Sequence, residues 1–485
     1  MKKSFALMAG MAGILPCMTS CNEEGKKSDD RPNIILFVTD DHGMDALGCY
    51  GNPVIHTPNL DKLADEGVRF TNAYCTSASS AASRSVILTG LYGHATGAYG
   101  HVHDYHHFST YNTVRSLPVI LSENGYHTAR IGKYHVAPEK VYYFDETLQA
   151  DPRNTVQMAD ACKDLFQSEE PFFLYFCTDD PHRSDFTVEK EDWRAPNLFG
   201  NKNQGYEGVH DVIYSPDEVL VPSFLPDTPE TRAELAQYYQ SVSRVDEGFG
   251  RLMQHLVASG KDDNTVVIYI SDNGVAFAGA KTTLYEPGIH LPCIIRDPSI
   301  EAQGFVTDVM ISWADLTPTI LDYAGADLEK EHFHGRSFRP VLTEENPEGW
   351  DEIAASHTFH EITMYYPMRV YRKGNFKLIW NIAWPLEYPF ASDLWVSSTW
   401  QRIYRDGNPY YGKRATEKYL HRPEFELYDL ENDPDEIVNL SENPHYASCL
   451  ADMKSALRQW QYATDDPWLI MWNHDTALQG IGEKL

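Results

Sequence analysis

A short serine-rich segment holds residues that could carry out nucleophilic chemistry. Ser80 lies four positions before Arg84, and Leu88-Thr89-Gly90 closes the segment. A serine hydroxyl is a weak nucleophile at neutral pH, so it needs activation by a base, a metal ion or a chemical conversion. The segment therefore indicates a nucleophile at Ser80, although a Ser/Ala-rich loop that enters a helix would have the same composition.

Polar side chains follow four predicted strands at the point where each strand ends. The strands are expected at residues 33–39, 127–131, 172–178 and 265–271. They are followed in turn by Asp40-Asp41, by Lys133 and His135, by Asp179-Asp180-Pro181-His182, and by Asp272-Asn273-Gly274. Because ligands of open α/β sheets bind outside the carboxyl ends of the strands, we expect these groups to share one site. Taken singly, each is equally typical of a helix cap, a turn or a structural histidine.

The oxygen ligands in this set favour a particular class of metal. Asp40, Asp41, Asp272 and Asn273 offer only hard oxygen donors, which suit Ca²⁺ or Mg²⁺ and are poor ligands for Zn²⁺. Calcium tolerates irregular, carboxylate-rich sites, so the sequence predicts Ca²⁺, which would act as a Lewis acid and a template. Fixed positive charge for an anionic transferred group is expected from Arg84, Lys133 and Lys281.

The elements that position these groups are those of an α/β protein. Apolar runs alternate with helical patterns at residues 59–66, 116–124 and 229–259, which predicts a mostly parallel sheet flanked by helices. After Trp350 the sequence changes to aromatic-rich, turn-rich segments with short strands such as 376–380. We therefore predict a catalytic α/β domain at residues 31–350 and a smaller α+β domain at 351–485.

Composition limits the partners that the chain can have. Its 485 residues are 42% hydrophobic and 23% charged, as in globular proteins, and the formal net charge is −30. A surface of this sign repels nucleic acid and anionic membranes, so an anionic substrate must be drawn in by a local basic pocket. The eight cysteines form no CxxC pair and no zinc pattern, so few or no disulfides are expected.

The amino terminus is typical of an export signal. Lys2-Lys3 precede an apolar run that is too short to span a bilayer, and Met18-Thr19-Ser20-Cys21 is similar to a bacterial lipobox. These features predict a lipoprotein signal peptide at residues 1–21, a flexible tether at 22–30, and a periplasmic protein with a lipid anchor at Cys21. Cleavage by ordinary signal peptidase, giving a soluble periplasmic enzyme, is the alternative.

Several motifs together resemble the type I sulfatases of the alkaline phosphatase superfamily. They are Asp40-Asp41, Ser80 to Gly90, Gly132-Lys133, Asp180-Pro181-His182, Ser271-Asp272-Asn273-Gly274, Lys281, Leu284-Tyr285-Glu286-Pro287-Gly288 and Asp315-Leu316-Thr317-Pro318-Thr319. The resemblance implies an alkaline-phosphatase-like fold and a Ser80 that a sulfatase-maturing enzyme converts to formylglycine (3-oxoalanine). It further implies calcium bound by Asp40, Asp41, Ser80, Asp272 and Asn273. The catalytic residues that it implies are Ser80, Arg84, Lys133, His135, His182 and Lys281.

Other segments resemble the branch of this family that removes N-sulfate from heparan sulfate. They are residues 104–108, 114–118, 133–139, 220–226 and 360–369. This resemblance implies an exo-acting enzyme that hydrolyses the N-sulfate of non-reducing-end glucosamine in heparan sulfate or heparin saccharides, with His182 as acid and His135 as base. His106, Glu361 and Arg369 would line the sugar subsite, although a buried aromatic–histidine cluster without a ligand would show the same residues.

Three alternatives to this function stay open at the level of sequence. Lys281 stands where the N-sulfatase branch is expected to have Arg, which leaves room for an O-sulfatase acting on, for example, 6-O-sulfated N-acetylglucosamine. A phosphoryl-transfer enzyme using unmodified Ser80 would need two metals with several His ligands, and we expect no HxxxH-like ligand set in this chain. A glycan-binding lipoprotein without activity would not need every position of the site to be filled.

Overall fold

The computed structural model describes residue 1 and residues 30–184, 192–301, 303–344 and 347–473. Apart from Met1 and Asp30, the predicted signal peptide and tether lie outside the described residues. The described residues from Arg31 onward form one compact unit. Across these described ranges, no helix has the length and apolar character needed to cross a membrane.

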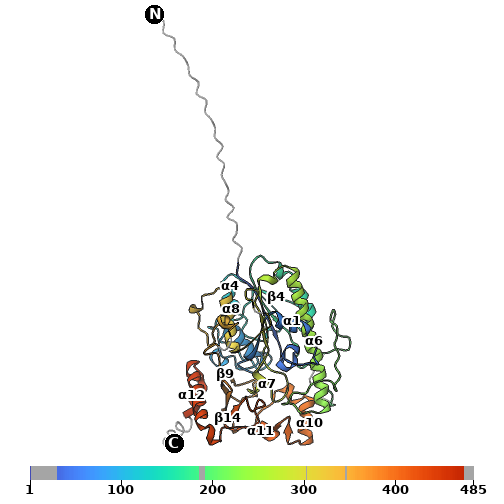
Figure 1. Ribbon diagram of the computed structural model, residues 1–485, viewed down its shortest axis with the longest axis vertical. Coiled ribbons are helices and arrows are strands. Elements are labelled where there is room, and N and C mark those ends of the chain that lie inside the picture. The colour runs from blue at the N-terminus through green and yellow to red at the C-terminus, as the bar shows by residue number, and fades with distance from the viewer. Residues whose placement is uncertain (2–29, 185–191, 302, 345–346, 474–485) are drawn as a thin grey trace. The chain divides into compact units, whose positions relative to one another are not determined.

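An eight-stranded sheet forms the centre of the unit (Figure 1). The strands are β1 Asn33–Thr39, β2 Val68–Tyr74, β3 His127–Gly132, β4 Glu146–Leu148, β5 Phe172–Cys177, β6 Thr265–Ser271, β7 Cys293–Arg296 and β8 Phe305–Ser312. Their order is β4-β3-β5-β1-β6-β7-β2-β8, and only β7 runs antiparallel to its neighbours. In the central register, Leu36 of β1 lies opposite Tyr175 of β5 and Ile268 of β6. The mostly parallel sheet predicted from the sequence is confirmed.

Helices cover both faces of this sheet. Their bounds are α1 Pro58–Glu66, α2 Ser80–Thr89, α3 Gly93–Thr96, α4 Leu117–Glu123, α5 Thr155–Ala161, α6 Pro229–Ala258, α7 Glu286–Ile289 and α8 Leu316–Tyr323. Leu36 and Val38 belong to a core with residues of α2, α4 and α8, whereas Ile35 and Phe37 belong to a second core with residues of α1, α5 and α6. Figure 1 shows α4 and α8 on one side of the sheet and α1 and α6 on the other. Burial on both faces explains why the central strands are almost continuously apolar.

Local signals fix the ends of the helices that bear on the site. Helix α6 begins with Pro229 after Thr228, whose side chain accepts a hydrogen bond from Thr231 N at 3.2 Å. Helix α2 begins at Ser80 and ends at Gly90, which has a left-handed φ of 67° and donates its N–H to Val86 O at 2.8 Å. The nucleophile predicted from the sequence is thus the first residue of a ten-residue helix.

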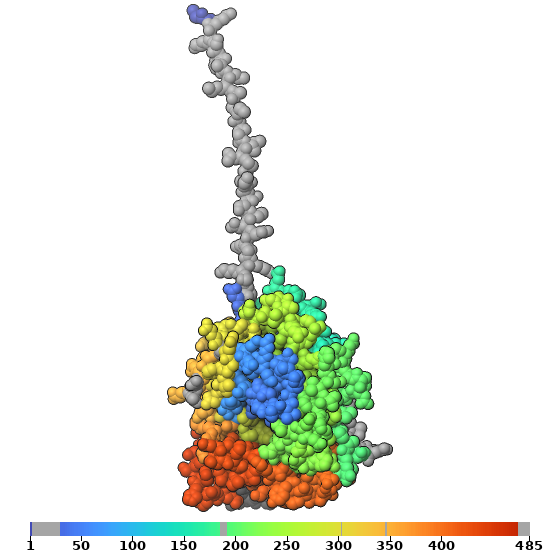
Figure 2. Space-filling view, turned by 45° about the vertical axis from the view of Figure 1, so that its right-hand side comes forward, coloured from blue at the N-terminus to red at the C-terminus, as the bar shows by residue number. Residues whose placement is uncertain are grey.

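A second, antiparallel sheet of order β14-β11-β10-β9 follows in the chain. Its strands are β9 Glu352–His357, β10 Met368–Lys373, β11 Phe376–Asn381 and β14 Phe425–Asp429, and the remaining elements are α9 Ser392–Trp395, α10 Ser398–Asp406, β12 Tyr410–Tyr411, β13 Arg414–Ala415, α11 Thr416–Leu420 and α12 Ala447–Ala463. Met453 and Leu457 of α12 pack on this sheet. On the face drawn in Figure 2, the C-terminal residues lie together at one end of the unit. The predicted smaller α+β part is present, while its boundary at residue 350 stays a prediction.

Candidate active site

Neighbouring strands of the large sheet bring the predicted site residues together. β3, β5, β1 and β6 are adjacent and parallel, so their carboxyl ends meet at one edge. The groups that follow them are Lys133, His182, Asp40 with Asp41, and Asp272 with Asn273. Backbone hydrogen bonds extend the pairing past the strand ends, because Asp272 N donates to Thr39 O at 3.0 Å and Asp40 N to Asp180 O at 3.2 Å.

Ser80 lies beside these strand ends with its side chain held in place. Its hydroxyl donates to Asp40 Oδ1 at 2.8 Å and lies 3.1 Å from Asn273 Oδ1. The residue is 1% exposed, and the free N–H groups at the start of α2 place partial positive charge around it. The start of this helix therefore contributes positive potential at Ser80.

Three carboxylates form a buried cluster next to Ser80. Oxygens of Asp40, Asp41 and Asp272 lie within 4.8 Å of one another, and all three residues are fully buried. Asp272 accepts hydrogen bonds from the backbone N–H groups of Asp41 at 3.1 Å and Asn273 at 2.7 Å. The Asn273 amide donates to Asp41 Oδ1 at 2.7 Å. Carboxylate and amide oxygens are thus fixed around one point.

Three cations surround the cluster. Arg84 Nε donates to Asp272 Oδ2 at 3.0 Å, and Lys133 pairs with Asp40. Lys281 Nζ donates to Asp41 Oδ2 at 2.9 Å and lies 3.1 Å from His182 Nε2.

Lys281 has a further partner that the sequence analysis did not identify. Its ammonium group donates to Asp393 Oδ2 at 2.9 Å, and Asp393 lies in α9 of the C-terminal part. A second carboxylate therefore holds Lys281 at the floor of the site.

The charges of this site do not balance. Burial raises the pKa of Asp41 to about 7, against Lys281 and with the help of Asp40, Asp272 and Asp393. Burial likewise raises the pKa of Asp272 to about 6. Asp40 shows the opposite, because Lys133 and the other cations outweigh its burial and hold its pKa well below the usual value. Four buried carboxylates face three cations, so the site as it stands would be stabilised by further positive charge.

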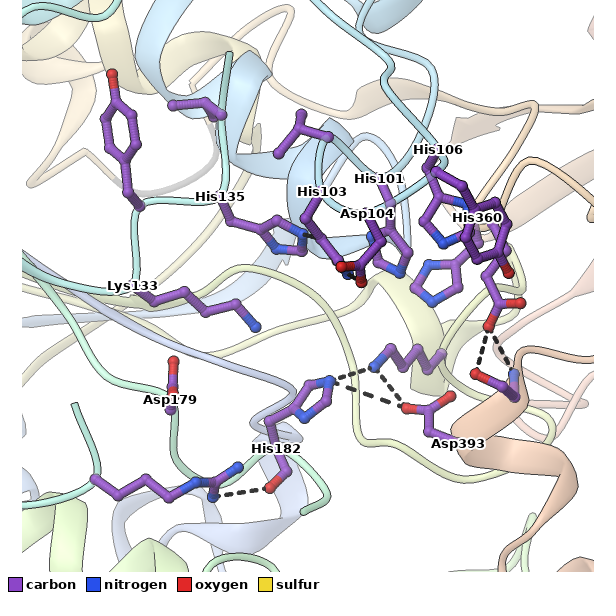
Figure 3. A pocket seen from close by; sticks show the side chains of 18 residues that line it. His101, His103, Asp104, His106, Lys133, His135, Asp179, His182, His360 and Asp393 are labelled. Atoms are coloured by element: carbon purple, nitrogen blue, oxygen red, sulfur yellow. Dashed lines mark hydrogen bonds and ion pairs between the residues drawn. The ribbon is translucent and has the colours of Figure 1, made fainter. Parts of the chain in front are cut away.

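A pocket of about 700 Å³ opens above this floor. Lys133, His182 and Lys281 line it and also contact the carboxylates, so they lie between the pocket and the buried cluster. Figure 3 shows Lys133, His182 and Asp393 on one side of the pocket and a row of histidines on the other. The histidines of that row are His101, His103, His106, His135 and His360.

The predicted sugar-binding residues differ in their positions. His106 and Glu361 line the pocket. Glu361 accepts hydrogen bonds from the backbone and hydroxyl of Ser392, each at 2.7 Å. Arg369 does not reach the pocket, because it is fully buried in β10 and holds Asp466 through Nε at 2.6 Å and Nη2 at 2.8 Å. Its assignment to the sugar subsite is corrected to a structural ion pair.

Among the histidines and charged residues that line the pocket, four were not identified from the sequence. They are His101, His103, Arg153 and Asp393. The run His101-Val102-His103-Asp104-Tyr105-His106-His107, with four histidines in seven residues, was a visible signal. Asp393 had none, because it lies 112 residues beyond Lys281 and only the fold brings the two together.

The chain matches two family models. Residues 32–326 match the model of the sulfatase family, and residues 279–386 match the model described as N-sulphoglucosamine sulphohydrolase, C-terminal. Human N-sulphoglucosamine sulphohydrolase is 37% identical over 462 residues, with 90% of this chain and 91% of the human protein covered. N-acetylglucosamine-6-O-sulfatase of Bacteroides thetaiotaomicron is 26% identical, with 93% and 90% covered.

Solved structures show the same fold. A structure of a protein in complex with its substrate D-glucosamine-2-N,6-O-disulfate aligns with a TM-score of 0.65 at 24% identity, covering 90% of this chain and 99% of that one. A 2-O glycosaminoglycan sulfatase aligns with a TM-score of 0.67 at 19% identity, covering 90% and 93%. With the strand-end residues assembled around Ser80, these matches show that the chain belongs to the sulfatase family, in the group of N-sulphoglucosamine sulphohydrolases.

Proposed function

We propose that this enzyme hydrolyses the N-sulfate of the glucosamine at the non-reducing end of heparan sulfate or heparin saccharides. The observation that carries the proposal is Ser80, whose hydroxyl is held by Asp40 and Asn273 at the start of α2, beneath a pocket lined with cations and histidines. The 37% identity to the human N-sulphoglucosamine sulphohydrolase over 90% of the chain supports this substrate. A pocket whose walls come from both parts of the chain supports action on a chain end.

The carboxylate cluster fits a divalent cation. Its donors are hard oxygens, fully buried and within 4.8 Å of one another, and together with Asp393 its three carboxylates exceed the three cations by one charge. We propose that Asp40, Asp41, Asp272, Asn273 and the oxygen at residue 80 would hold Ca²⁺, which when bound supplies Lewis-acid polarisation of the sulfate. One dication would turn the net charge of this group from −1 to +1, which favours an anionic substrate.

Ser80 occupies the position that is converted to formylglycine in the type I sulfatases. We propose that a sulfatase-maturing enzyme makes this conversion here, and that the hydrated aldehyde would supply the attacking oxygen. An activated group is required, because an unmodified serine hydroxyl is a weak nucleophile.

The cations of the floor are placed to bind the sulfate group. Lys133 and Lys281 line the pocket, and Arg84 lies behind them against Asp272. Fixed positive groups in a buried site stabilise charge that develops on the transferred group. In the overall reaction the S–N bond breaks, sulfur gains an oxygen from water, and the departing nitrogen takes a proton.

Two histidines are positioned for proton transfer in different ways. His182 Nδ1 donates to Arg183 O at 2.6 Å, so its Nε2 faces Lys281 Nζ as an acceptor. We therefore assign protonation of the leaving nitrogen to the Lys281–His182 pair rather than to His182 alone. His135 is neutral, since burial and the charge of Lys133 lower its pKa well below the usual value, and a neutral imidazole is able to accept a proton as a base.

One observation favours O-sulfate hydrolysis as a second candidate. Lys281 presents a single ammonium group to the pocket, whereas a guanidinium would grip a sulfate in a bidentate way. The relation to the Bacteroides thetaiotaomicron N-acetylglucosamine-6-O-sulfatase is compatible with this alternative.

The deciding experiment measures sulfate release by the matured, calcium-loaded protein from three substrates side by side. They are N-sulfoglucosamine, 6-O-sulfated N-acetylglucosamine and a 2-O-sulfated disaccharide, with the Ser80→Ala variant as the blank. We expect release from N-sulfoglucosamine at the non-reducing end. Release from the 6-O-sulfated sugar, with N-sulfoglucosamine untouched, would support the O-sulfatase and overturn the N-sulfatase.

We also propose that the enzyme is exported and anchored by a lipid at Cys21. The proposal rests on the lipobox-like Met18-Thr19-Ser20-Cys21 alone. Labelling of expressing cells with a radioactive fatty acid tests it: wild-type protein should carry the label and the Cys21→Ala variant should not. An unlabelled wild-type protein would favour ordinary signal-peptide cleavage.

A further inference from the structure

We infer that His101, His103 and His135 form a second metal site, distinct from the carboxylate cluster, that takes a transition-metal dication such as Zn²⁺ or Co²⁺. One imidazole nitrogen from each residue lies within 4.8 Å of the other two. His103 Nδ1 and His135 Nε2 are 2.9 Å apart, and the ring of His101 is centred 4.8 Å from that of His103 and 5.1 Å from that of His135. Figure 3 shows the three rings together on the wall of the pocket.

Ring nitrogens in this group lack protein partners. Nδ1 of His101 and Nδ1 of His135 are buried and make no hydrogen bond to any described residue. A buried polar atom without a partner is costly, so two of them in neighbouring rings call for an explanation. A metal ion bound by the triad would take up one lone pair from each ring.

Backbone hydrogen bonds hold the main chain of two of these histidines in the 101–108 loop. His101 N donates to His360 O at 2.9 Å, and Phe108 N donates back to His101 O at 3.1 Å. His106 N donates to His103 O at 3.2 Å, which closes a turn after His103. Ligands that stand on a held main chain lose less conformational entropy when an ion binds.

Backbone conformation provides a second sign of a constrained site. His135 has a φ of 51° and Asp104 a φ of 52°, in the left-handed region that residues other than glycine rarely adopt. Such residues persist where the surroundings over-determine them, and they cluster at ligand clamps and active sites. Here one of them is a member of the triad and the other adjoins His103.

The donor type selects the class of metal. Three neutral imidazoles suit Zn²⁺, Co²⁺, Ni²⁺ or Cu²⁺, whereas Ca²⁺ prefers oxygen ligands and is directed to the carboxylate cluster. Three protein ligands leave a fourth position for water on the pocket side, as in open zinc sites. Asp104 Oδ2 lies 3.6 Å from His103 Nε2, where a carboxylate orients a metal-bound imidazole from behind.

Occupancy of this site has a consequence for catalysis that rests on the proposed function. The lone pair that His135 would use as a base is the one that the metal would take. A transition-metal dication should therefore inhibit sulfate release while calcium stays bound. Binding itself is measured without any substrate, so failure of the site and failure of the proposed activity are distinguishable.

Titration of the full-length, matured, calcium-saturated protein with Co²⁺ tests the site through its visible d–d absorption. We expect one Co²⁺ to bind with the intense bands of a four-coordinate nitrogen-rich site. The His103→Asn and His101→Asn variants should each weaken this binding by about 100-fold, and Asp104→Asn by about 10-fold. His107→Asn is the matched control, because His107 is exposed on the same loop and does not line the pocket.

Melting curves identify any variant that fails to fold, and the His101 and His103 variants check each other. Weak bands of an oxygen-ligated octahedral ion, or a spectrum that persists unchanged in both variants, would overturn the assignment.

Discussion

Two groups of buried carboxylates and cations in this molecule differ in whether their charges balance. One lies under the pocket and the other in the C-terminal part. Under the pocket, Asp40, Asp41 and Asp272 crowd together, and with Asp393 they outnumber the cations that contact them by four to three. In the C-terminal part, Asp466 meets Arg369 in a bidentate pair with both side chains fully buried. The first group adjoins a pocket, whereas neither member of the second lines it.

The pKa values of the carboxyl groups differ between the two groups in the same way as their charge balance. Hydrogen bonds from Arg369 outweigh burial at Asp466 and lower its pKa to about 2. Burial and like charges raise the pKa of Asp41 to about 7. A satisfied pair keeps its carboxylate ionised without help, but the cluster under the pocket would need an additional cation to do so. Buried charge alone does not identify a functional site, whereas an excess of buried charge of one sign beside a pocket does.

Ser80→Ala should have the largest effect, because it removes the only atom on which the nucleophile can be formed. We expect sulfate release to fall by at least about 10⁴-fold with the melting temperature nearly unchanged. Ser85→Ala is the matched control, since Ser85 lies in the same helix and bonds Tyr142 instead of the site. Peptide mass spectrometry of the wild type should find an aldehyde at residue 80. Substantial turnover by the Ser80→Ala variant would refute the site.

Asp466→Asn should lower the stability of the protein and leave its activity per folded molecule unchanged. It therefore distinguishes the Arg369–Asp466 pair from the carboxylate cluster under the pocket. Arg369 would keep its bonds to backbone carbonyls but lose the negative charge that neutralises it, which costs about 3–5 kcal/mol of unfolding free energy. Because the folded pKa of about 2 lies below the unfolded value of about 3.9, the pair stabilises above pH ~4 and loses this effect as pH falls towards 2. Urea unfolding at several pH values measures it, with exposed Asp465→Asn as the control. A raised KM in the folded fraction would return Arg369 to the sugar subsite.

Removal of calcium should lower the stability of the wild type and leave the Asp272→Asn variant unaffected. An ion that binds only the folded state contributes about 2.7 kcal/mol at one hundred times its Kd. Thermal melts with and without chelator measure the shift for both proteins, and exposed Asp308→Asn should respond as the wild type does. Equal melting temperatures with and without chelator in the wild type would argue against a metal in the carboxylate cluster.

The parts of the fold that were predictable are those buried on both faces of the sheet. β1, β5 and β6 have only buried residues, so their sequences are continuous apolar runs. β2 and β8 could not be predicted, because each mixes buried with partly exposed residues. They pair with each other across more than 200 residues of sequence. β7 has four residues, too few for a periodic pattern.

The site residues, too, fall into those that follow a predictable strand and those that only tertiary packing brings to the pocket. Asp40 and Asp272 directly follow predictable strands, so topology alone places them together. Asp393 and His101 reach the pocket by tertiary packing, from a four-residue helix and a loop. Arg369 was assigned to the sugar subsite because sequence shows a residue type but not its partner, and Asp466 lies 97 residues further along.

The smallest expected effect concerns the choice between N- and O-sulfate. Lys281 is held by Asp41, Asp393 and the ring of His182, and it presents one ammonium group to the pocket. Lys281→Arg would offer a planar fork that binds two sulfate oxygens at once. We expect the ratio of N-sulfate to 6-O-sulfate release to rise by up to about tenfold, or ~1.4 kcal/mol, even if both rates fall. Because the ratio is taken within one preparation, incomplete folding or maturation cancels. A fall in this ratio would show that Arg at position 281 does not favour the N-sulfate.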